Sequence, residues 1–207
     1  KDQMEISIKY SKLDNIKASP TLFFEFHGSE TTNNEAIDIV KELSKNNNGS
    51  DFQWASSPEE QKKLWKARHD VYYSVKALGN NMKVYSTDVC VPISRLVECI
   101  SWAEKEVNKL GLTAPMVGHV GDGNFHSIVL YDPHDKEKQK KIRQYSDDLI
   151  NKALELEGTI TGEHGIGLQK KHYLLKEHLD NLPVMKAIKR SLDTNNIMNP
   201  GKVFDLN

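Results

Sequence analysis

The chain contains the run Met116-Val-Gly-His-Val-Gly-Asp-Gly-Asn-Phe-His-Ser-Ile-Val-Leu-Tyr131. Its two ends, Met116 to His119 and Phe125 to Tyr131, have the apolar composition of β-strands. The Gly-Asp-Gly-Asn sequence between them favours a chain reversal, because Gly and Asn tolerate positive φ. The run therefore predicts a β-hairpin that places His119 and His126 on opposing strands, within reach of one ion.

Helices and strands are expected on both sides of this hairpin. Helical spacing of apolar residues predicts helices over 35–43, 94–110 and 136–156, and alternation predicts a strand over 84–91. Ser57 followed by a proline and two acids predicts a helix start, with the helix continuing towards Leu78. Further predicted elements are a buried strand over Thr21 to Phe26, weaker strands over 52–55 and 159–161, and two short C-terminal helices.

This order of elements indicates the fold class. Two long helices among mostly consecutive strands predict an α+β layer. We expect a ferredoxin-like antiparallel sheet with helices packed mainly on one face, in one domain spanning residues 1–207.

Composition excludes several classes of function. The 207 residues, with 28 Lys and Arg against 29 Asp and Glu, allow one large or two small domains. The net charge of −1 argues against nucleic-acid binding. No apolar run approaches the ~20 residues of a membrane span. The start has neither a signal peptide nor an initiator Met, which suggests a piece of a longer chain. Cys90 and Cys99 are expected to be reduced core thiols.

A second candidate site is the glycine-rich run Thr161-Gly-Glu-His-Gly-Ile-Gly167. Its glycines indicate a sharp turn or a close approach of the backbone to another group. Neighbours in an extended loop point in opposite directions, so Glu163 and His164 are expected to serve different tasks. Two imidazoles with one carboxylate form the ligand set of a catalytic divalent site, for which Zn and Mn are both admissible. The alternative is that each His is a hydrogen-bonded core residue and each glycine-rich run a simple turn.

Arg68 allows two interpretations. Its spacing favours a solvated charge on a helix, and the alternative is a guanidinium that binds a substrate carboxylate. The sequence has no Gly-x-Gly-x-x-Gly that opens a helix, no P-loop and no nucleophile elbow. By itself the chain is therefore not expected to hold a dinucleotide.

Five motifs in the same order resemble the C-terminal domain of FAD-linked oxidases of the vanillyl-alcohol-oxidase superfamily. They are Leu64-Trp-Lys-Ala-Arg68, Ser86-Thr-Asp-Val-Cys-Val-Pro92, Gly118-His-Val-Gly-Asp-Gly-Asn-Phe-His126, Thr161-Gly-Glu-His-Gly-Ile-Gly167 and Met198-Asn-Pro-Gly-Lys202. The first two look most like the mitochondrial, cytochrome-linked members that oxidise D-lactate.

The resemblance implies a role for individual residues. It implies that His119, His126 and Glu163 bind a divalent metal, Zn or Mn. It implies that His164 faces the substrate, and that Arg68 binds the substrate carboxylate, against the interpretation favoured by spacing. It also implies flavin contacts at the last motif, by Asn199 and Lys202. We expect His164 to act as the general base, because the pKa of imidazole is near neutral.

The resemblance further implies a substrate. Relatives that oxidise D-2-hydroxyglutarate have a Lys where this chain has Ser86 and an Asn where it has Ile128. Both differences remove partners of a second carboxylate, which favours a monocarboxylate such as D-lactate.

The expected activity is FAD-dependent oxidation of D-lactate to pyruvate, with electrons passed to cytochrome c or a quinone. Glycolate or D-2-hydroxyglutarate oxidation is one alternative, and a non-catalytic metal-binding docking domain is another. The family's N-terminal FAD-binding domain is absent from this sequence, so the piece alone is expected to be inactive. A mitochondrial location is implied, and the oligomeric state is left open.

Overall fold

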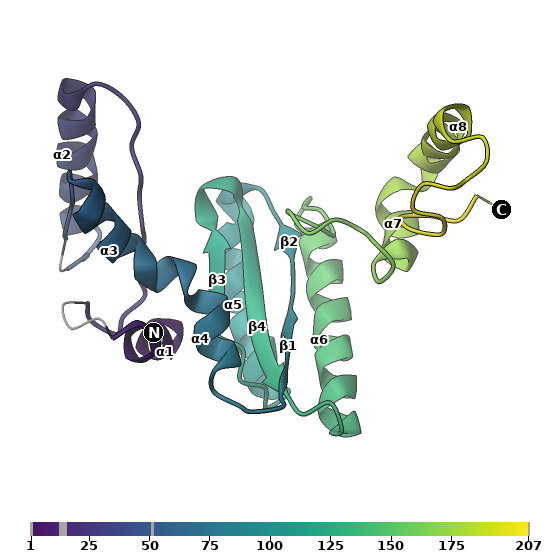
Figure 1. Cartoon of the computed structure of the whole chain (residues 1–207), viewed down its shortest axis with the longest axis horizontal. Helices are drawn as coiled ribbons and strands as arrows, with labels where there is room; N and C mark the ends of the chain where they lie inside the picture. The colour runs from purple at the N-terminus through teal and green to yellow at the C-terminus, as the bar shows by residue number, and fades with distance from the viewer. Residues whose placement is uncertain (1, 13–15, 51, 207) are drawn as a thin grey trace. The chain divides into compact units, whose positions relative to one another are not determined.

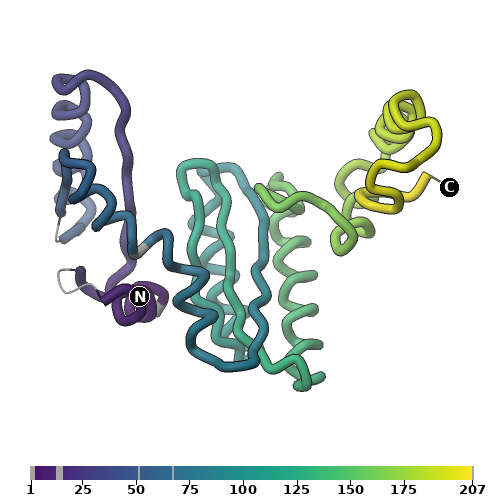
Figure 2. Tube along the Cα trace, in the orientation of Figure 1, coloured from purple at the N-terminus to yellow at the C-terminus, as the bar shows by residue number. Residues whose placement is uncertain are grey.

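The computed structural model describes residues 2–12, 16–50 and 52–206. The chain divides into two compact units, Lys1–Asn80 and Asn81–Asn207 (Figures 1 and 2). Each unit is treated by itself below.

In the N-terminal unit, all regular secondary structure among the described residues is helical. Its helices are α1 (Asp2–Ser11), α2 (Glu30–Asn46), α3 (Pro58–His69) and α4 (Val71–Lys76). The predicted start at Ser57 is confirmed, because its side chain accepts a hydrogen bond from the Glu60 amide. Helix α1 packs against α4, where Gln3 donates to Ser74 over 3.3 Å.

Three predictions for this unit are wrong. Residues 21–26 and 52–55 are in no strand, and Leu22 and Phe24 are 63% and 54% exposed rather than buried. A strand requires a partner for its backbone groups, and no described residue pairs with these two segments. The helix predicted to continue from Ser57 towards Leu78 is instead interrupted at Asp70, whose carboxylate accepts hydrogen bonds from Ser11 and Lys66.

The C-terminal unit is built on one long strand, β4 (Asn124–Tyr131). Three shorter antiparallel strands pair with it: β1 (Lys83–Ser86), β2 (Val89–Cys90) and β3 (Met116–His119). The predicted hairpin is confirmed, with Val117 opposite His126. A short 3-10 helix, η1 (Val120–Asp122), and Gly123 at φ 77° make the reversal.

The strand predicted over 84–91 is present but interrupted at Thr87 and Asp88. Ser86 pairs with Ile128 and Val89 pairs with Phe125, so the register is the same on both sides of the interruption. Thr87 still exchanges hydrogen bonds with Ser127, through its backbone amide and its side-chain oxygen. The chain therefore stays paired with β4 at Thr87, while the side chain of Asp88 accepts hydrogen bonds from a different segment.

Two long helices cover one face of the sheet, as expected for the α+β class. They are α5 (Ile93–Lys109) and α6 (Lys136–Glu155), which pack on each other and on the strands (Figure 1). Their contact forms the core around fully buried residues that include Cys99, Phe125, Val129, Tyr145 and Leu149.

The remaining elements lead to the C-terminus. Of the predicted strand over 159–161, a single bridge from Thr159 to Cys90 is present. The two predicted C-terminal helices are confirmed as α7 (Lys171–His178) and α8 (Leu182–Leu192), joined by η2 (Leu179–Asn181). Among the described residues, no helix is long and apolar enough to span a membrane.

Candidate functional site

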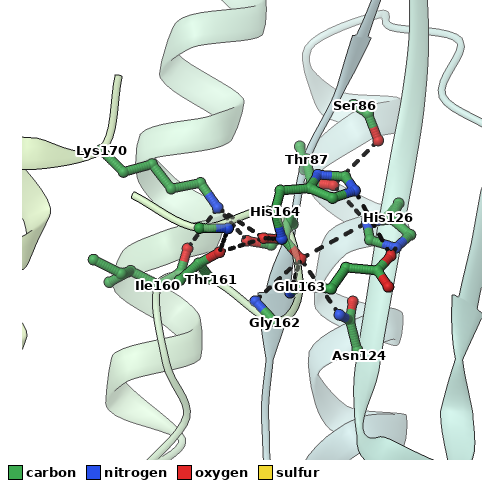
Figure 3. A network of polar contacts seen from close by, with 12 residues as sticks. Ser86, Thr87, Asn124, His126, Ile160, Thr161, Gly162, Glu163, His164 and Lys170 are labelled. Atoms are coloured by element: carbon green, nitrogen blue, oxygen red, sulfur yellow. Dashed lines mark hydrogen bonds and ion pairs between the residues drawn. The ribbon is translucent and has the colours of Figure 1, made fainter. Parts of the chain in front are cut away.

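The two histidine-containing motifs meet at the end of the sheet where β2, the β3–β4 hairpin and the 161–167 loop come together (Figure 3). The bridge between Thr159 and Cys90 brings the loop to this place, since each residue's amide donates to the other's carbonyl. The site is therefore assembled from segments far apart in the sequence.

Glu163 is the point on which the histidines converge. Its carboxylate lies 2.7 Å from Nε2 of His126, 3.8 Å from Nε2 of His119 and 3.6 Å from Nε2 of His164. The structure thus brings together all three residues for which a metal-binding role was predicted.

His126 is the most fixed of these side chains, being 8% exposed against 43% for Glu163. Its Nδ1 lies 2.8 Å from the Thr87 carbonyl, which can only accept a hydrogen bond and therefore sets the proton on Nδ1. A neutral ring would then turn an unprotonated Nε2 towards the Glu163 carboxylate. Two acceptors at this distance repel, so a second proton or a bound cation must complete the contact.

His164 lies over His126 rather than beside it. The two rings stack with their centroids 4.8 Å apart and their planes 8° from parallel (Figure 3). The expectation that Glu163 and His164 point in opposite directions is wrong, because both side chains reach the same cluster. The reason is that the loop is not extended but curled around the carboxylate of Asp88.

Asp88 is the residue that sequence reasoning missed. Its side chain is 1% exposed and accepts hydrogen bonds from the amides of Gly162, Glu163 and His164. Thr161 and Lys170 donate to it through their side chains. A charged residue inside the predicted strand over 84–91 was the available signal.

Burial alone would raise the pKa of Asp88. The hydrogen bond from Thr161, the charge and hydrogen bond of Lys170 and the amide of His164 outweigh burial and hold the pKa well below its usual range. Burial conversely lowers the pKa of Lys170, against the attraction of Asp88. The pair nevertheless supplies each buried charge with a partner.

Gly162 makes the close approach expected of the glycine-rich loop. A Cβ there would lie 2.0 Å from Nδ2 of Asn124 and 3.0 Å from Oδ1 of Asp88. Gly165 and Gly167 make the predicted turn instead, with φ of 77° and 52°. Asn124 is 4% exposed, and its Oδ1 has no hydrogen-bond partner among the described residues.

Lys202 lies on the wall of a cavity of about 940 Å³ that also borders His164. The motif that carries Lys202 is attached to the loop, because the Val203 amide donates to the Gly167 carbonyl over 2.8 Å. Asn199, at φ 46°, accepts a hydrogen bond from Lys202. Other cationic and aromatic residues of the cavity wall are Arg143, Lys170, His172, Tyr85, Tyr131 and Tyr173.

Ser86 and Ile128 are direct partners across β1 and β4. Cross-strand partners share a face, and Ile128 lies two residues after His126, so all three occupy the same face of the sheet. The two positions expected to distinguish substrates are therefore adjacent. Arg68 lies in the last turn of α3, in the N-terminal unit, and its role stays a prediction.

The chain matches the family model described as FAD linked oxidases, C-terminal domain, over residues 1–203. It is 47% identical over 190 residues to a probable mitochondrial D-lactate dehydrogenase of Danio rerio, covering 91% of this chain and 38% of that protein. It is 40% identical over 205 residues to a mitochondrial D-lactate dehydrogenase (cytochrome) of Arabidopsis thaliana, covering 98% and 36%.

A glycolate oxidase subunit GlcD of Bacillus subtilis is 31% identical over 188 residues, which cover 90% of this chain and 40% of that protein. The chain spans less than half the length of these relatives. Among solved structures, 4-ethylphenol oxidase from Gulosibacter chungangensis in its isoeugenol complex has a TM-score of 0.59 at 18% identity, covering 86% of this chain and 38% of that one. At that identity the likeness concerns the fold.

Proposed function

The chain belongs to the family of FAD linked oxidase C-terminal domains, and from this membership we propose that it is the substrate- and metal-binding part of an FAD-dependent D-2-hydroxy acid dehydrogenase. The proposed reaction converts D-lactate to pyruvate. The observation that carries the proposal is the convergence of His119, His126 and His164 on the carboxylate of Glu163.

The donor set fits a divalent metal. His119, His126 and Glu163 would hold the ion, because two imidazoles and one carboxylate leave room for a substrate oxygen. The contact between His126 and Glu163, which requires a proton or a cation, supports this assignment. Zn and Mn both suit these ligands. When bound, the metal supplies Lewis acidity to the substrate hydroxyl.

His164 is the proposed general base. Imidazole is the side chain best suited to exchange a proton near neutral pH. Its Nε2 lies on the Glu163 side of the cluster, and the residue also borders the cavity, so it can face a bound hydroxy acid. Arg68 is the proposed partner of the substrate carboxylate.

FAD, when bound, would supply the hydride acceptor, and cytochrome c or a quinone is the proposed final acceptor of the electrons. We propose that it is held mainly by a part of the protein outside this chain, with Asn199 and Lys202 contributing from here. The position of Lys202 on the cavity wall supports this role.

D-Lactate is proposed because Ser86 and Ile128 offer no cation to a second carboxylate. Ser86 lines the cavity, while Ile128 is buried and apolar. Glycolate is the second candidate, favoured by the similarity to glycolate oxidase subunits. A mitochondrial location is proposed from the names of the D-lactate dehydrogenases of Danio rerio and Arabidopsis thaliana.

The test is metal analysis together with a panel of D-lactate, glycolate and D-2-hydroxyglutarate on the complete flavoprotein. His119→Ala is expected to lose bound metal and D-lactate turnover together. His134→Ala is the control, since His134 is an exposed histidine in the loop before α6. Full turnover by a metal-free His119→Ala protein would contradict the proposal. Faster turnover of glycolate than of D-lactate would make glycolate the substrate instead.

A further inference from the structure

We propose that Asp88 is a positioning residue for the metal site: it fixes the 161–165 loop so that Glu163 and His164 face the hairpin histidines, and it is not itself a metal ligand. This inference rests on the proposed function, because it takes the metal ligands to be His119, His126 and Glu163.

The hydrogen bonds of Asp88 use up its capacity to accept. Oδ1 accepts from the amides of Gly162 at 3.0 Å and Glu163 at 3.1 Å. The same oxygen also accepts a hydrogen bond from Nδ2 of Asn124 at 3.4 Å. A carboxylate has about four lone-pair sites, two on each oxygen. Oδ1 is therefore fully occupied without a metal.

Oδ2 is equally occupied. It accepts from the Thr161 hydroxyl at 2.5 Å, the His164 amide at 3.1 Å and the Lys170 ammonium at 3.1 Å. A cation at this oxygen would have to displace Lys170 or a backbone amide, and Lys170 would repel it. Both charge and hydrogen bonding thus disfavour a metal on Asp88.

The alternative is that Asp88, His126 and His164 form a metal triad. One ligand atom from each of the three lies within 4.8 Å of the others. However, the lone pair of an imidazole nitrogen lies in the plane of its ring, and the planes of His126 and His164 are 8° from parallel. Lone pairs in stacked, parallel planes do not converge on one ion, so the stacking argues against this triad.

The contacts show how Asp88 orients the loop. Three successive amides, from Gly162 to His164, point at one carboxylate, which curls the backbone into an anion-binding nest. Thr161 closes the curl, because its hydroxyl donates to Asp88 and accepts from the Gly165 amide. The curl turns the side chains of Glu163 and His164 to the same side, where His126 lies (Figure 3).

Asp88 also connects the loop to the hairpin. Asn124, which donates to Asp88, is paired with His119 across β3 and β4. One carboxylate therefore sets the distance between the two motifs that supply the proposed metal ligands. Partners of this kind typically change metal affinity 10–100-fold when removed.

The test is calorimetric titration of the full chain with Mn²⁺, repeated with Co²⁺ while visible absorption is recorded. Asp88→Asn is expected to weaken binding about 10–100-fold and to leave the position of the Co²⁺ bands unchanged, because the ligands stay the same. Thr161→Val is expected to weaken binding less, and Thr161→Ser, which keeps the hydroxyl, to restore it. The second pair keeps the test informative if Asp88→Asn does not fold.

The matched control is Asp193→Asn. Asp193 is also buried and also accepts two amides, from Ile197 and Met198, together with an ion pair from Lys189. Its loss is expected to lower the melting temperature without changing Mn²⁺ affinity. A purely structural role for Asp88 would make the two variants behave alike in both measurements, and that result overturns the inference.

Two further outcomes separate this inference from the proposed function. Displaced Co²⁺ bands in Asp88→Asn would make Asp88 a ligand and refute the positioning role. If the unmodified chain binds neither ion, the proposed metal site fails. Amide hydrogen exchange then decides the positioning role: protection of Gly162, Glu163 and His164 that is lost in Asp88→Asn upholds it, and unchanged exchange refutes it.

Discussion

Substitution of Gly162 by alanine tests the packing on which the whole site depends. The added Cβ would lie 2.0 Å from Nδ2 of Asn124, whereas ordinary contacts begin at 3.4 Å, so the loop must move by about 1.4 Å. Asn124 cannot yield easily, because it is 4% exposed and hydrogen-bonded to Asp88. A movement of that size breaks the bonds from the Gly162 and Glu163 amides, now 3.0 and 3.1 Å long.

The expected cost follows from these bonds. Hydrogen bonds to a charged acceptor contribute about 1.5–3 kcal/mol each, and relaxation of the loop recovers part of the loss. We expect the free energy of unfolding to fall by about 2–4 kcal/mol. At about 2–4 °C per kcal/mol for a chain of this size, the melting temperature should fall by roughly 4–16 °C. Affinity for Mn²⁺ should fall about 10–100-fold, since Glu163 moves with the loop.

Thermal unfolding followed by circular dichroism, with calorimetric Mn²⁺ titration, measures both effects. Gly121→Ala is the control, because nothing lies within 4 Å of a Cβ there, and it should stay within about 0.5 kcal/mol of the parent. If Gly162→Ala melts with this control and binds Mn²⁺ normally, the close approach of loop and hairpin is wrong.

Three further predictions concern acid stability, thiol reactivity and substrate choice. The pKa of Asp88 in the folded chain lies well below the value of about 3.9 for an Asp in an unfolded chain. The contribution of Asp88 to stability is therefore present above about pH 4 and is lost as the pH falls further. The stability of Asp88→Asn should accordingly depend less steeply on pH than that of the parent between about pH 4 and 2. Burial raises the pKa of Cys99 to about 11, so a thiol reagent at pH 8 should leave Cys99 unmodified until the chain is denatured, and rapid labelling of a folded Cys90→Ser protein would contradict its burial. In the complete flavoprotein, Ser86→Lys should raise kcat/KM for D-2-hydroxyglutarate relative to D-lactate about 10-fold or more, because it adds a partner for a second carboxylate; an unchanged ratio would remove Ser86 from the substrate pocket.

The hairpin was predictable because its signal is local. Gly and Asn between two apolar segments specify a reversal whatever the rest of the chain does, and Val117 is indeed paired with His126. The helix start at Ser57 is equally local, since the cap and the Glu60 amide it serves are three residues apart. Local sequence chemistry was therefore sufficient to predict the start of α3 and the hairpin that holds His119 and His126.

The segment Thr21 to Phe26 shows what local chemistry does not contain. Its apolar composition suits a strand, but a strand exists only where another segment pairs with its backbone, and Phe24 is 54% exposed here. Asp88 was missed for the same kind of reason. Its partners Thr161 and Glu163 lie 73 and 75 positions further along the chain, and no spacing pattern spans such a separation.

The candidate site consists of a rigid part, the hairpin, and a less rigid part, the 161–167 loop. The hairpin supplies His126, buried and held by the Thr87 carbonyl, whereas Glu163 is 43% exposed on a loop attached largely through Asp88. Segments with few buried contacts open at lower free energy than the core. Loss of the Asp88 contacts should therefore release Glu163 and His164 while the sheet stays folded. Metal affinity therefore reports on the loop directly, whereas global stability reports on the loop and the sheet together.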